Sequence, residues 1–198
     1  MQLRYFVVYK PYLMLSQFVS PYEQRLLGDL DFSFPPGTNA VGRLDNHSEG
    51  LLILTNDKSL TRRLLHPSKQ HFRRYAVLVK GIVTDDELQT LRSGVEIGVK
   101  GKGFQTTLPC DVRIISGEEF AEREPPYIKY GPHTWLEFIL TQGKNRQIRK
   151  MCRAVRHEVQ RLIRTHIEDL SLEDLKAGEV REIDKTKIET LLGLAQTQ

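Results

Sequence analysis

The alternation of apolar and polar positions divides the chain into short strands and helices. Runs of aromatic and β-branched residues, closed by glycine, proline or charged residues, are typical of β-strands. Such runs predict strands at 5–9, 50–54, 75–83, 135–140 and 159–167.

Glycine-rich and turn-rich segments separate these runs. Residues 31–40 are dense in turn formers and are expected to form a loop. Between 95 and 115, Gly98, Gly101 and Gly103 stand among β-forming residues, which predicts a hairpin. A phosphate-binding glycine loop is the alternative, but no P-loop Lys-Ser/Thr pair follows and no dinucleotide fingerprint fits.

Apolar residues at helical spacing, preceded by capping residues, predict helices elsewhere. One helix is expected at 21–30. A second should run from Asn56 or Asp57 to Pro67, with Leu60, Leu64 and Leu65 on it. A third should run from a Thr84–Glu87 capping box to Gly94, and a fourth is expected around Ile188, Leu191 and Leu192.

A basic amphipathic segment covers residues 145–155. One helical face carries apolar residues that should pack on a sheet, and the other face is basic and points to a cleft or to solvent. The apolar residues are Ile148, Met151, Cys152 and Val155, and the basic ones are Arg146, Arg149, Lys150 and Arg153.

Strands and helices mix without the regular β-α-β alternation of a doubly wound sheet. We therefore expect an α+β fold around a largely antiparallel sheet. The length of 198 residues suits one domain, built as a whole or from two lobes. We see no internal repeat and no low-complexity linker in the chain.

Composition narrows the class of protein. Hydrophobic residues make up 39% and charged residues 27%, as in ordinary globular proteins. No apolar run approaches the roughly 20 residues that span a bilayer, and no signal peptide is recognisable. Cys110 and Cys152 are far apart and lack a CxxC partner, so we expect no disulfide framework, no zinc site and a reducing, cytoplasmic compartment.

The net charge of +4 is modest, but the positive charge is concentrated. Such a concentration is either a solvated face or a surface for a polyanion. Between 144 and 164, where Glu158 is the only acid, the basic residues are Lys144, Arg146, Arg149, Lys150, Arg153, Arg156, Arg161 and Arg164.

Two segments carry candidate chemistry. In 41–57, Arg43 and Asp45 occupy a turn before the predicted strand 50–54, where a carboxylate is well placed for a site. The alternative is that Asp45 only caps the turn. In 142–155, an arginine facing Asp45 would keep that carboxylate ionised and oriented. The alternative is that these arginines meet only phosphate or solvent.

The pairing of GRLDNHSEGLL with a later GKNRQIRKM resembles the RsuA/RluB/E/F branch of the pseudouridine synthases. Lys10-Pro11 with Ser16 resembles the family's first motif, and the RYAV sequence at 74–77 resembles its tyrosine motif. RLIRT at 161–165 and LKAGE at 175–179 resemble its C-terminal strand and turn. The resemblance extends from about residue 5 to 183.

The resemblance implies roles for individual residues. Asp45 matches the catalytic aspartate, Arg149 the arginine that forms a salt bridge with it, and Tyr75 the tyrosine that packs on the target base. The expected RNA-binding residues are Lys10, Arg43, Lys144, Arg146, Lys150, Arg153 and Arg164.

The resemblance also implies the fold and the reaction. The expected architecture is one catalytic domain over residues 1–198, with a mixed sheet in two lobes and a central RNA-binding cleft. The expected reaction is isomerisation of a flipped-out uridine to pseudouridine in ribosomal RNA, most simply that of the large subunit. It requires no cofactor and no metal, and we expect a monomer with RNA as its partner and no membrane association.

The sequence departs from the family pattern at several points. We expect no N-terminal helical RNA-binding module of the kind that many relatives carry, and in this the sequence most resembles the synthase E group. Leu13 stands where the first motif normally has glycine. Arg156 and Glu158 flank His157 where relatives often have glycine and proline.

Other functions stay open at this point. The same reaction on small-subunit rRNA or tRNA is one, and a catalytically idle RNA-binding protein is another. A metal-dependent nuclease would need clustered carboxylates. The densest acidic run, Asp85-Asp86-Glu87, opens a predicted helix, where acids are favoured by the helix dipole.

Overall fold

The computed structural model describes residues 2–66, 70–120, 123–126 and 130–194. These residues form two compact units. Unit 1 comprises the described residues of 1–71 and 163–198, and unit 2 those of 72–162. Strand β9 (Val159–Ile167) contributes residues to both.

The sheet of unit 1 has the strand order β11-β1-β3-β9. Strand β1 is antiparallel to β11 and β3, whereas β3 is parallel to β9. Two short strands, β2 and β10, pair with β3 and β9. The bounds are β1 Tyr5–Lys10, β2 Asn39–Ala40, β3 Glu49–Thr55, β10 Leu170–Ser171 and β11 Val180–Ile183.

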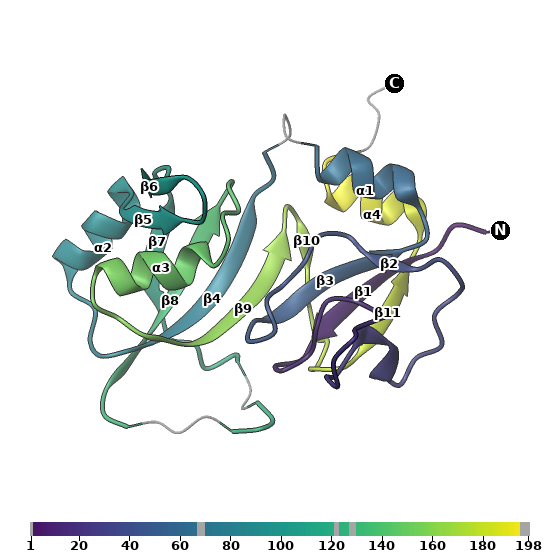
Figure 1. Ribbon diagram of the computed structural model, residues 1–198, viewed down its shortest axis with the longest axis horizontal. Helices are drawn as coiled ribbons and strands as arrows, with labels where there is room; N and C mark the ends of the chain where they lie inside the picture. Colours follow the sequence, from purple (N-terminus) through teal and green to yellow (C-terminus); the bar gives the residue numbers. More distant parts are fainter. Residues whose placement is uncertain (1, 67–69, 121–122, 127–129, 195–198) are drawn as a thin grey trace. The chain divides into compact units, whose positions relative to one another are not determined.

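Helices α1 (Lys58–Leu64) and α4 (Lys185–Leu191) lie together in unit 1 (Figure 1). Asp57 caps α1 by accepting a hydrogen bond from Ser59 N at 2.8 Å, as the sequence predicts. It also accepts one from the Tyr5 hydroxyl at 2.8 Å. These hydrogen bonds lower the pKa of the Asp57 carboxyl in spite of its burial.

The predicted helix at 21–30 is wrong. The segment contains only a 3-10 turn, η1 (Leu27–Asp29). Its backbone instead bonds to a distant segment, because Leu15 N donates to Arg25 O and Leu27 N donates to Gln17 O. Apolar spacing did not reveal these non-local hydrogen bonds.

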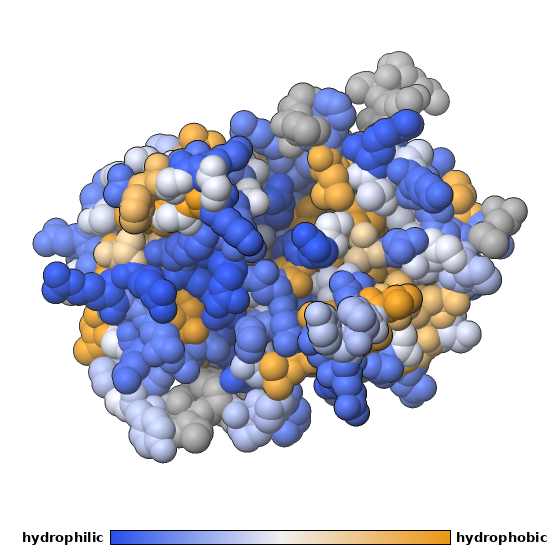
Figure 2. All heavy atoms as spheres, in the orientation of Figure 1, coloured by the Kyte–Doolittle hydropathy of each residue, from blue (hydrophilic) through white to orange (hydrophobic). Residues whose placement is uncertain are grey.

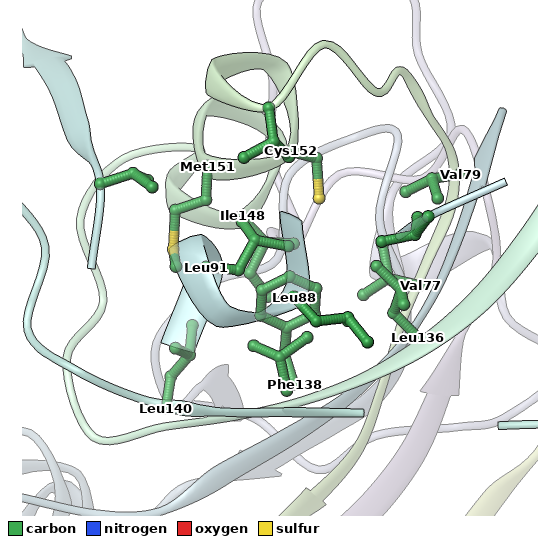
Figure 3. Packing of buried hydrophobic residues seen from close by; sticks show 14 of the residues in the cluster. Val77, Val79, Leu88, Leu91, Leu136, Phe138, Leu140, Ile148, Met151 and Cys152 are labelled. Atoms are coloured by element: carbon green, nitrogen blue, oxygen red, sulfur yellow. The ribbon is translucent and has the colours of Figure 1, made fainter. Parts of the chain in front are cut away.

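Unit 2 is built on antiparallel strands β4 (Arg73–Lys80), β8 (His133–Leu140) and β7 (Asp111–Ile115). Two helices, α2 (Asp85–Ser93) and α3 (Gln147–Ala154), pack their apolar faces onto these strands. Figure 3 shows this core, with Leu88, Leu91, Ile148, Met151 and Cys152 from the helices against Val77, Val79, Leu136, Phe138 and Leu140 from the strands.

A separate two-stranded hairpin of β5 (Glu96–Val99) and β6 (Gly103–Thr106) confirms the hairpin prediction. The last part of the predicted segment is instead β7. The Thr84–Glu87 capping box of α2 is confirmed, with Gly94 at its C-terminal end. Asp85, Asp86 and Glu87 occupy the first turn of α2, as predicted.

The apolar face predicted for the second helix is correct at Leu60 and Leu64 but wrong at Leu65, which is 52% exposed. Leu65 is the residue after the last turn of α1, so it leaves the helical face. Pro67, predicted to close this helix, lies outside the described residues. The largely antiparallel, mixed α+β fold is confirmed.

Candidate active site and RNA-binding residues

Asp45 lies in a turn directly before the buried strand β3. Ser48 N donates to Asp45 O at 2.9 Å and closes the turn. Leu44 is buried and Arg43 is exposed, while Asp45 itself is half-buried. The turn therefore holds the carboxylate at the end of a rigid strand without enclosing it.

The loop from Lys10 to Ser16, which carries the first family motif, binds this turn. Leu13 N donates to Asn46 O at 2.9 Å. The Ser16 hydroxyl donates to Leu44 O at 2.9 Å and accepts from Leu44 N at 3.0 Å. Two motifs about 30 residues apart in sequence thus form one local structure on both sides of Asp45.

Leu13 adopts a φ of +57°, which lies in the left-handed region that favours glycine. The chain therefore has a leucine where the backbone conformation suits the glycine of the family motif. The strain is tolerated because the neighbouring hydrogen bonds fix the loop.

Lys10, at the end of β1, is fully buried. Its Nζ donates to Pro11 O at 2.8 Å and to Met14 O at 2.7 Å, and so shapes the same loop. Burial lowers the pKa of Lys10 to about 7. Glu49 and Asp45 partly offset this effect, which places Lys10 and Asp45 in one electrostatic environment.

Glu49 and Arg164 are also buried, with 1% and 6% exposure. Arg164 Nε donates to Leu51 O at 2.8 Å. Gly50 pairs with Arg164 across the parallel strands, and a Cβ at Gly50 would lie 2.3 Å from Arg164 O. We call Lys10, Glu49 and Arg164 the buried charge cluster. Sequence reasoning missed Glu49, although it stands four residues after Asp45 in the SEG sequence of the family motif.

The other two residues expected in catalysis belong to unit 2. Tyr75 lies on β4, half-buried, and packs against the core of this unit. Arg149 lies on α3, and its Nη1 donates to Val159 O at 3.2 Å. Asp45 belongs to unit 1.

The start of α3 differs from the prediction at Arg146. This residue is the N-cap, with a φ of +52°, and it precedes the helix instead of forming part of it. The Gln147 side chain accepts from Lys144 N at 2.9 Å and fixes the first turn. Lys144 Nζ donates to Gln105 Oε1 at 2.8 Å, and Lys150 Nζ donates to Gly98 O at 2.7 Å. Both lysines therefore bind the β5–β6 hairpin.

The basic block of 144–164 is not uniformly exposed. Arg146, Arg153 and Arg156 are exposed, and Lys144, Arg149 and Lys150 are half-buried. Figure 2 shows hydrophilic side chains gathered over α3. Arg161 and Arg164 are buried, so the expectation of one basic surface is wrong at these two positions. Lys10 is buried as well and does not belong to it.

None of the helices in the described ranges is long and apolar enough to cross a membrane. Within the same ranges, no group of three or more His, Cys, Asp or Glu side chains is arranged to hold a metal ion.

The mixed, mainly antiparallel sheet with its flanking helices is the fold of a pseudouridine synthase, an isomerase acting on RNA. A solved structure described as "Crystal structure of pseudouridylate synthase" has the same fold, with a TM-score of 0.74 at 23% identity, covering 96% of this chain and 74% of that chain. The family described as "RNA pseudouridylate synthase" matches residues 4–154.

Two curated relatives are similar over most of their length. The Ribosomal large subunit pseudouridine synthase E of Vibrio vulnificus is 38% identical over 88% of this chain and 72% of its own. That of Xanthomonas axonopodis pv. citri is 38% identical over 84% of this chain and 86% of its own. The chain belongs to the RNA pseudouridylate synthase family, in its RsuA/RluB branch.

Proposed function

We propose that this pseudouridine synthase modifies a uridine of large-subunit ribosomal RNA and that Asp45 is its catalytic residue. The names of the synthase E relatives support the choice of RNA. The fixation of the Asp45 turn by the Lys10–Ser16 loop supports the choice of residue. This fixation is the observation that carries the proposal, because a catalytic group must be held in its productive geometry.

The reaction requires a carboxylate close to the base and the sugar. The bond between ribose carbon one and uracil nitrogen one breaks, the uracil rotates, and carbon five bonds to the ribose. The proton lost from carbon five is balanced by the proton gained at nitrogen one. Asp45 acts either as a nucleophile on the base or sugar or as a base on the ribose 2′ proton.

We propose Tyr75 and Arg149 as the partners of Asp45 in this chemistry. Tyr75 would stack on the flipped uracil, which offsets part of the few kcal/mol that base flipping costs. Arg149 would pair with the Asp45 carboxylate and orient it. The two units would then act as one catalytic domain.

RNA binding is assigned to the exposed and half-buried basic residues. Arg43, Lys144, Arg146, Lys150 and Arg153 would hold phosphates next to the target nucleotide. For Lys10 and Arg164 we propose a different role from the one expected from sequence. Their burial suits the positioning of the Asp45 turn and the end of β3 better than direct phosphate contact.

The test is incubation of the purified protein with unmodified large-subunit rRNA transcript, without added metal or cofactor. Pseudouridine is mapped by carbodiimide primer extension, with Asp45→Asn beside the wild type. We expect one new stop that the variant lacks, with a loss of turnover of at least 10³-fold. The variant should bind the transcript as the wild type does, because its side chain keeps nearly the same size.

Other results would correct the proposal. A stop only on small-subunit rRNA or tRNA would keep the reaction and change the substrate. Turnover by Asp45→Asn at a tenth of the wild-type rate would exclude Asp45 as the catalytic group. If no stop is formed on any of these RNAs and cells lacking the chain keep all their pseudouridines, the chain is an idle RNA-binding member of its family.

A further inference from the structure

The β5–β6 hairpin presents an aromatic side chain to solvent. Phe104 on β6 is 75% exposed, whereas Ile97 on β5 is 2% exposed and packs into the core of unit 2. Phe104 pairs directly with Gly98 across the hairpin. Directly paired residues lie on the same face, so Phe104 and Gly98 share the outer face.

The usual structural role of such a pair does not account for Phe104. An aromatic ring opposite a glycine in a sheet can stabilise the hairpin by covering the glycine. Here a Cβ built at Gly98 has no heavy atom within 4 Å, so the ring does not lie over it. Isolated exposed apolar residues are common, but this one is an aromatic residue that is 75% exposed.

Positive charge lies beside this surface, in the turn of the hairpin. Lys100 and Lys102 are exposed in the turn between the two strands. On the other side, Lys150 Nζ donates to Gly98 O at 2.7 Å and Lys144 Nζ to Gln105 Oε1 at 2.8 Å, which anchors the hairpin to the basic segment. A ligand at Phe104 therefore meets an aromatic face next to the two exposed lysines of the turn, Lys100 and Lys102. This combination complements a nucleotide, in which a planar base adjoins phosphate.

The remaining outer-face residues agree with a base at Phe104 and phosphates near the turn. Glu96 lies on the same face as Gly98, two residues earlier, and pairs with Thr106. Its carboxylate repels phosphate at that end of the hairpin. In Figure 2 the surface over the β5–β6 hairpin combines hydrophobic and near-neutral patches with hydrophilic ones.

We propose that Phe104 is a stacking site for an unpaired base of the substrate RNA, with Lys100 and Lys102 contacting the adjacent phosphates. The proposal rests on the proposed function in that the ligand is the RNA substrate. It adds a second contact for single-stranded RNA, separate from the proposed catalytic residues. A protein partner is the other occupant of such a surface, but the lysines of the turn favour RNA.

The test measures binding of a fluorescein-labelled single-stranded RNA of ten nucleotides and of a duplex of equal length, by anisotropy at several salt concentrations. The proteins are the wild type, Phe104→Ala, Phe104→Trp and the control Ile114→Ala, which removes another apolar side chain of unit 2 that is 50% exposed. Circular dichroism checks that each variant is folded.

Stacking predicts a specific pattern. Phe104→Ala should weaken single-strand binding about 5- to 100-fold, the range given by loss of one base–aromatic stack. The salt dependence should stay unchanged, because stacking releases no counterions. Phe104→Trp should bind at least as well as the wild type, and Ile114→Ala should bind equally well. The duplex, whose bases are already stacked, should show no difference between Phe104→Ala and the wild type.

The lysines should show the complementary pattern. The double variant Lys100→Gln/Lys102→Gln should weaken both RNAs and reduce the salt slope by about two. Single-strand binding by Phe104→Ala within twofold of the wild type would overturn the stacking site, and so would an equal loss on the duplex. An unchanged salt slope in the lysine variant would overturn the phosphate contacts.

These outcomes are distinguishable from failure of the proposed function, because binding is measured without turnover. Pseudouridine formation by the wild type combined with normal binding by Phe104→Ala would remove only the stacking site. A single-strand loss in Phe104→Ala combined with no pseudouridine formation would keep the stacking site and remove the enzyme assignment.

Discussion

The polar groups near Asp45 and those near α3 are held in opposite ways. Near Asp45, Lys10 and Arg164 are buried and bind backbone carbonyls of their own unit. At α3, Lys144 and Lys150 bind the β5–β6 hairpin from half-buried positions. Both arrangements bind basic side chains to neighbouring segments of the chain, but only the first removes these side chains from water.

This difference fits the two tasks proposed for the regions. Burying an ionised group costs several kcal/mol unless hydrogen bonds and opposite charges compensate, so a buried network has few alternative geometries. Such a network is suited to fixing a catalytic carboxylate. Solvated lysines and arginines keep many conformations and can follow a phosphate backbone. The comparison predicts that substitutions beside the buried charge cluster of unit 1 lower the free energy of unfolding strongly. Substitutions on the β5–β6 hairpin of unit 2 should change it little.

The largest expected contrast in stability is between two glycines. In Gly50→Ala the new Cβ would lie 2.3 Å from Arg164 O, at a φ of +101°. Overpacking and left-handed strain together should lower the free energy of unfolding by about 3 kcal/mol or more. In Gly98→Ala the new Cβ meets nothing within 4 Å. This variant should be unchanged or more stable by up to about 1 kcal/mol.

Urea unfolding followed by circular dichroism measures both variants against the wild type. If Gly50→Ala cannot be purified folded, a thermal shift assay in cell lysate still ranks the two variants. Equal stability of Gly50→Ala and the wild type would contradict the close approach of β3 and β9. A large loss in Gly98→Ala would contradict the open outer face of the hairpin.

Sequence patterns predicted the parts of this molecule that depend on local chemistry. Residues within one element predicted strands β1, β3, β4, β8 and β9, the Asp57 cap and the Thr84–Glu87 box. Strands β2, β7, β10 and β11 were not predicted from such patterns. The 21–30 segment could not be predicted, because its backbone bonds to residues 15–17. No local feature of residues 21–30 indicated a structure other than a helix.

The same contrast between local patterns and non-local contacts explains which features of the site were predicted from sequence and which were missed. Family motifs predicted Asp45, Tyr75 and Arg149, and their roles stay predictions. The binding of the Asp45 turn by Leu13 and Ser16 depends on tertiary contacts across about 30 residues. Periodicity carries no information on such contacts. Charge patterning likewise placed Arg164 on an RNA surface, because sequence does not show which basic residues are buried.

A smaller effect should appear in the pH dependence of stability. The pKa of Lys10 is lowered to about 7 in the folded chain, whereas an unfolded lysine keeps its proton to about pH 10. The unfolded state therefore binds more protons between these values, and stability should rise with pH from about 7 to about 10. The gain has an upper limit of about 1.4 kcal/mol per pH unit. A neutral amine still has two hydrogens for Pro11 O and Met14 O.

Urea unfolding of the wild type and Lys10→Met between pH 6 and pH 10 measures this effect. The variant should lack the rise, since it has no proton to release. The groups that face Lys10 are Glu49, Asp45, Arg25 and Arg164, and both proteins keep them. Lys58→Met, at an exposed position in the same unit, controls for the loss of a positive charge. Parallel pH curves for Lys10→Met and the wild type would contradict the assignment.

The smallest expected effect concerns Arg156, where the family resemblance leads one to expect glycine. Arg156 follows α3 with a φ of +65°, and His157 N donates to Cys152 O at 2.9 Å, which is the glycine-type end of a helix. Arg156→Gly relieves about 1 kcal/mol of left-handed strain but adds freedom to the unfolded chain. We expect a net stabilisation of about 0.5 kcal/mol, because the exposed arginine side chain contributes little packing.

Leu13→Gly likewise replaces a residue of positive φ by glycine, here beside the buried charge cluster. Leu13 is 38% exposed, so its replacement also removes partly buried apolar surface. It should therefore gain less stability than Arg156→Gly, or lose some. Urea unfolding of both variants decides the order. A larger gain for Leu13→Gly would mean that strain in the Lys10–Ser16 loop outweighs its packing. The loop beside Asp45 would then store more backbone strain than the end of α3. That result would be opposite to what the buried charge cluster predicts.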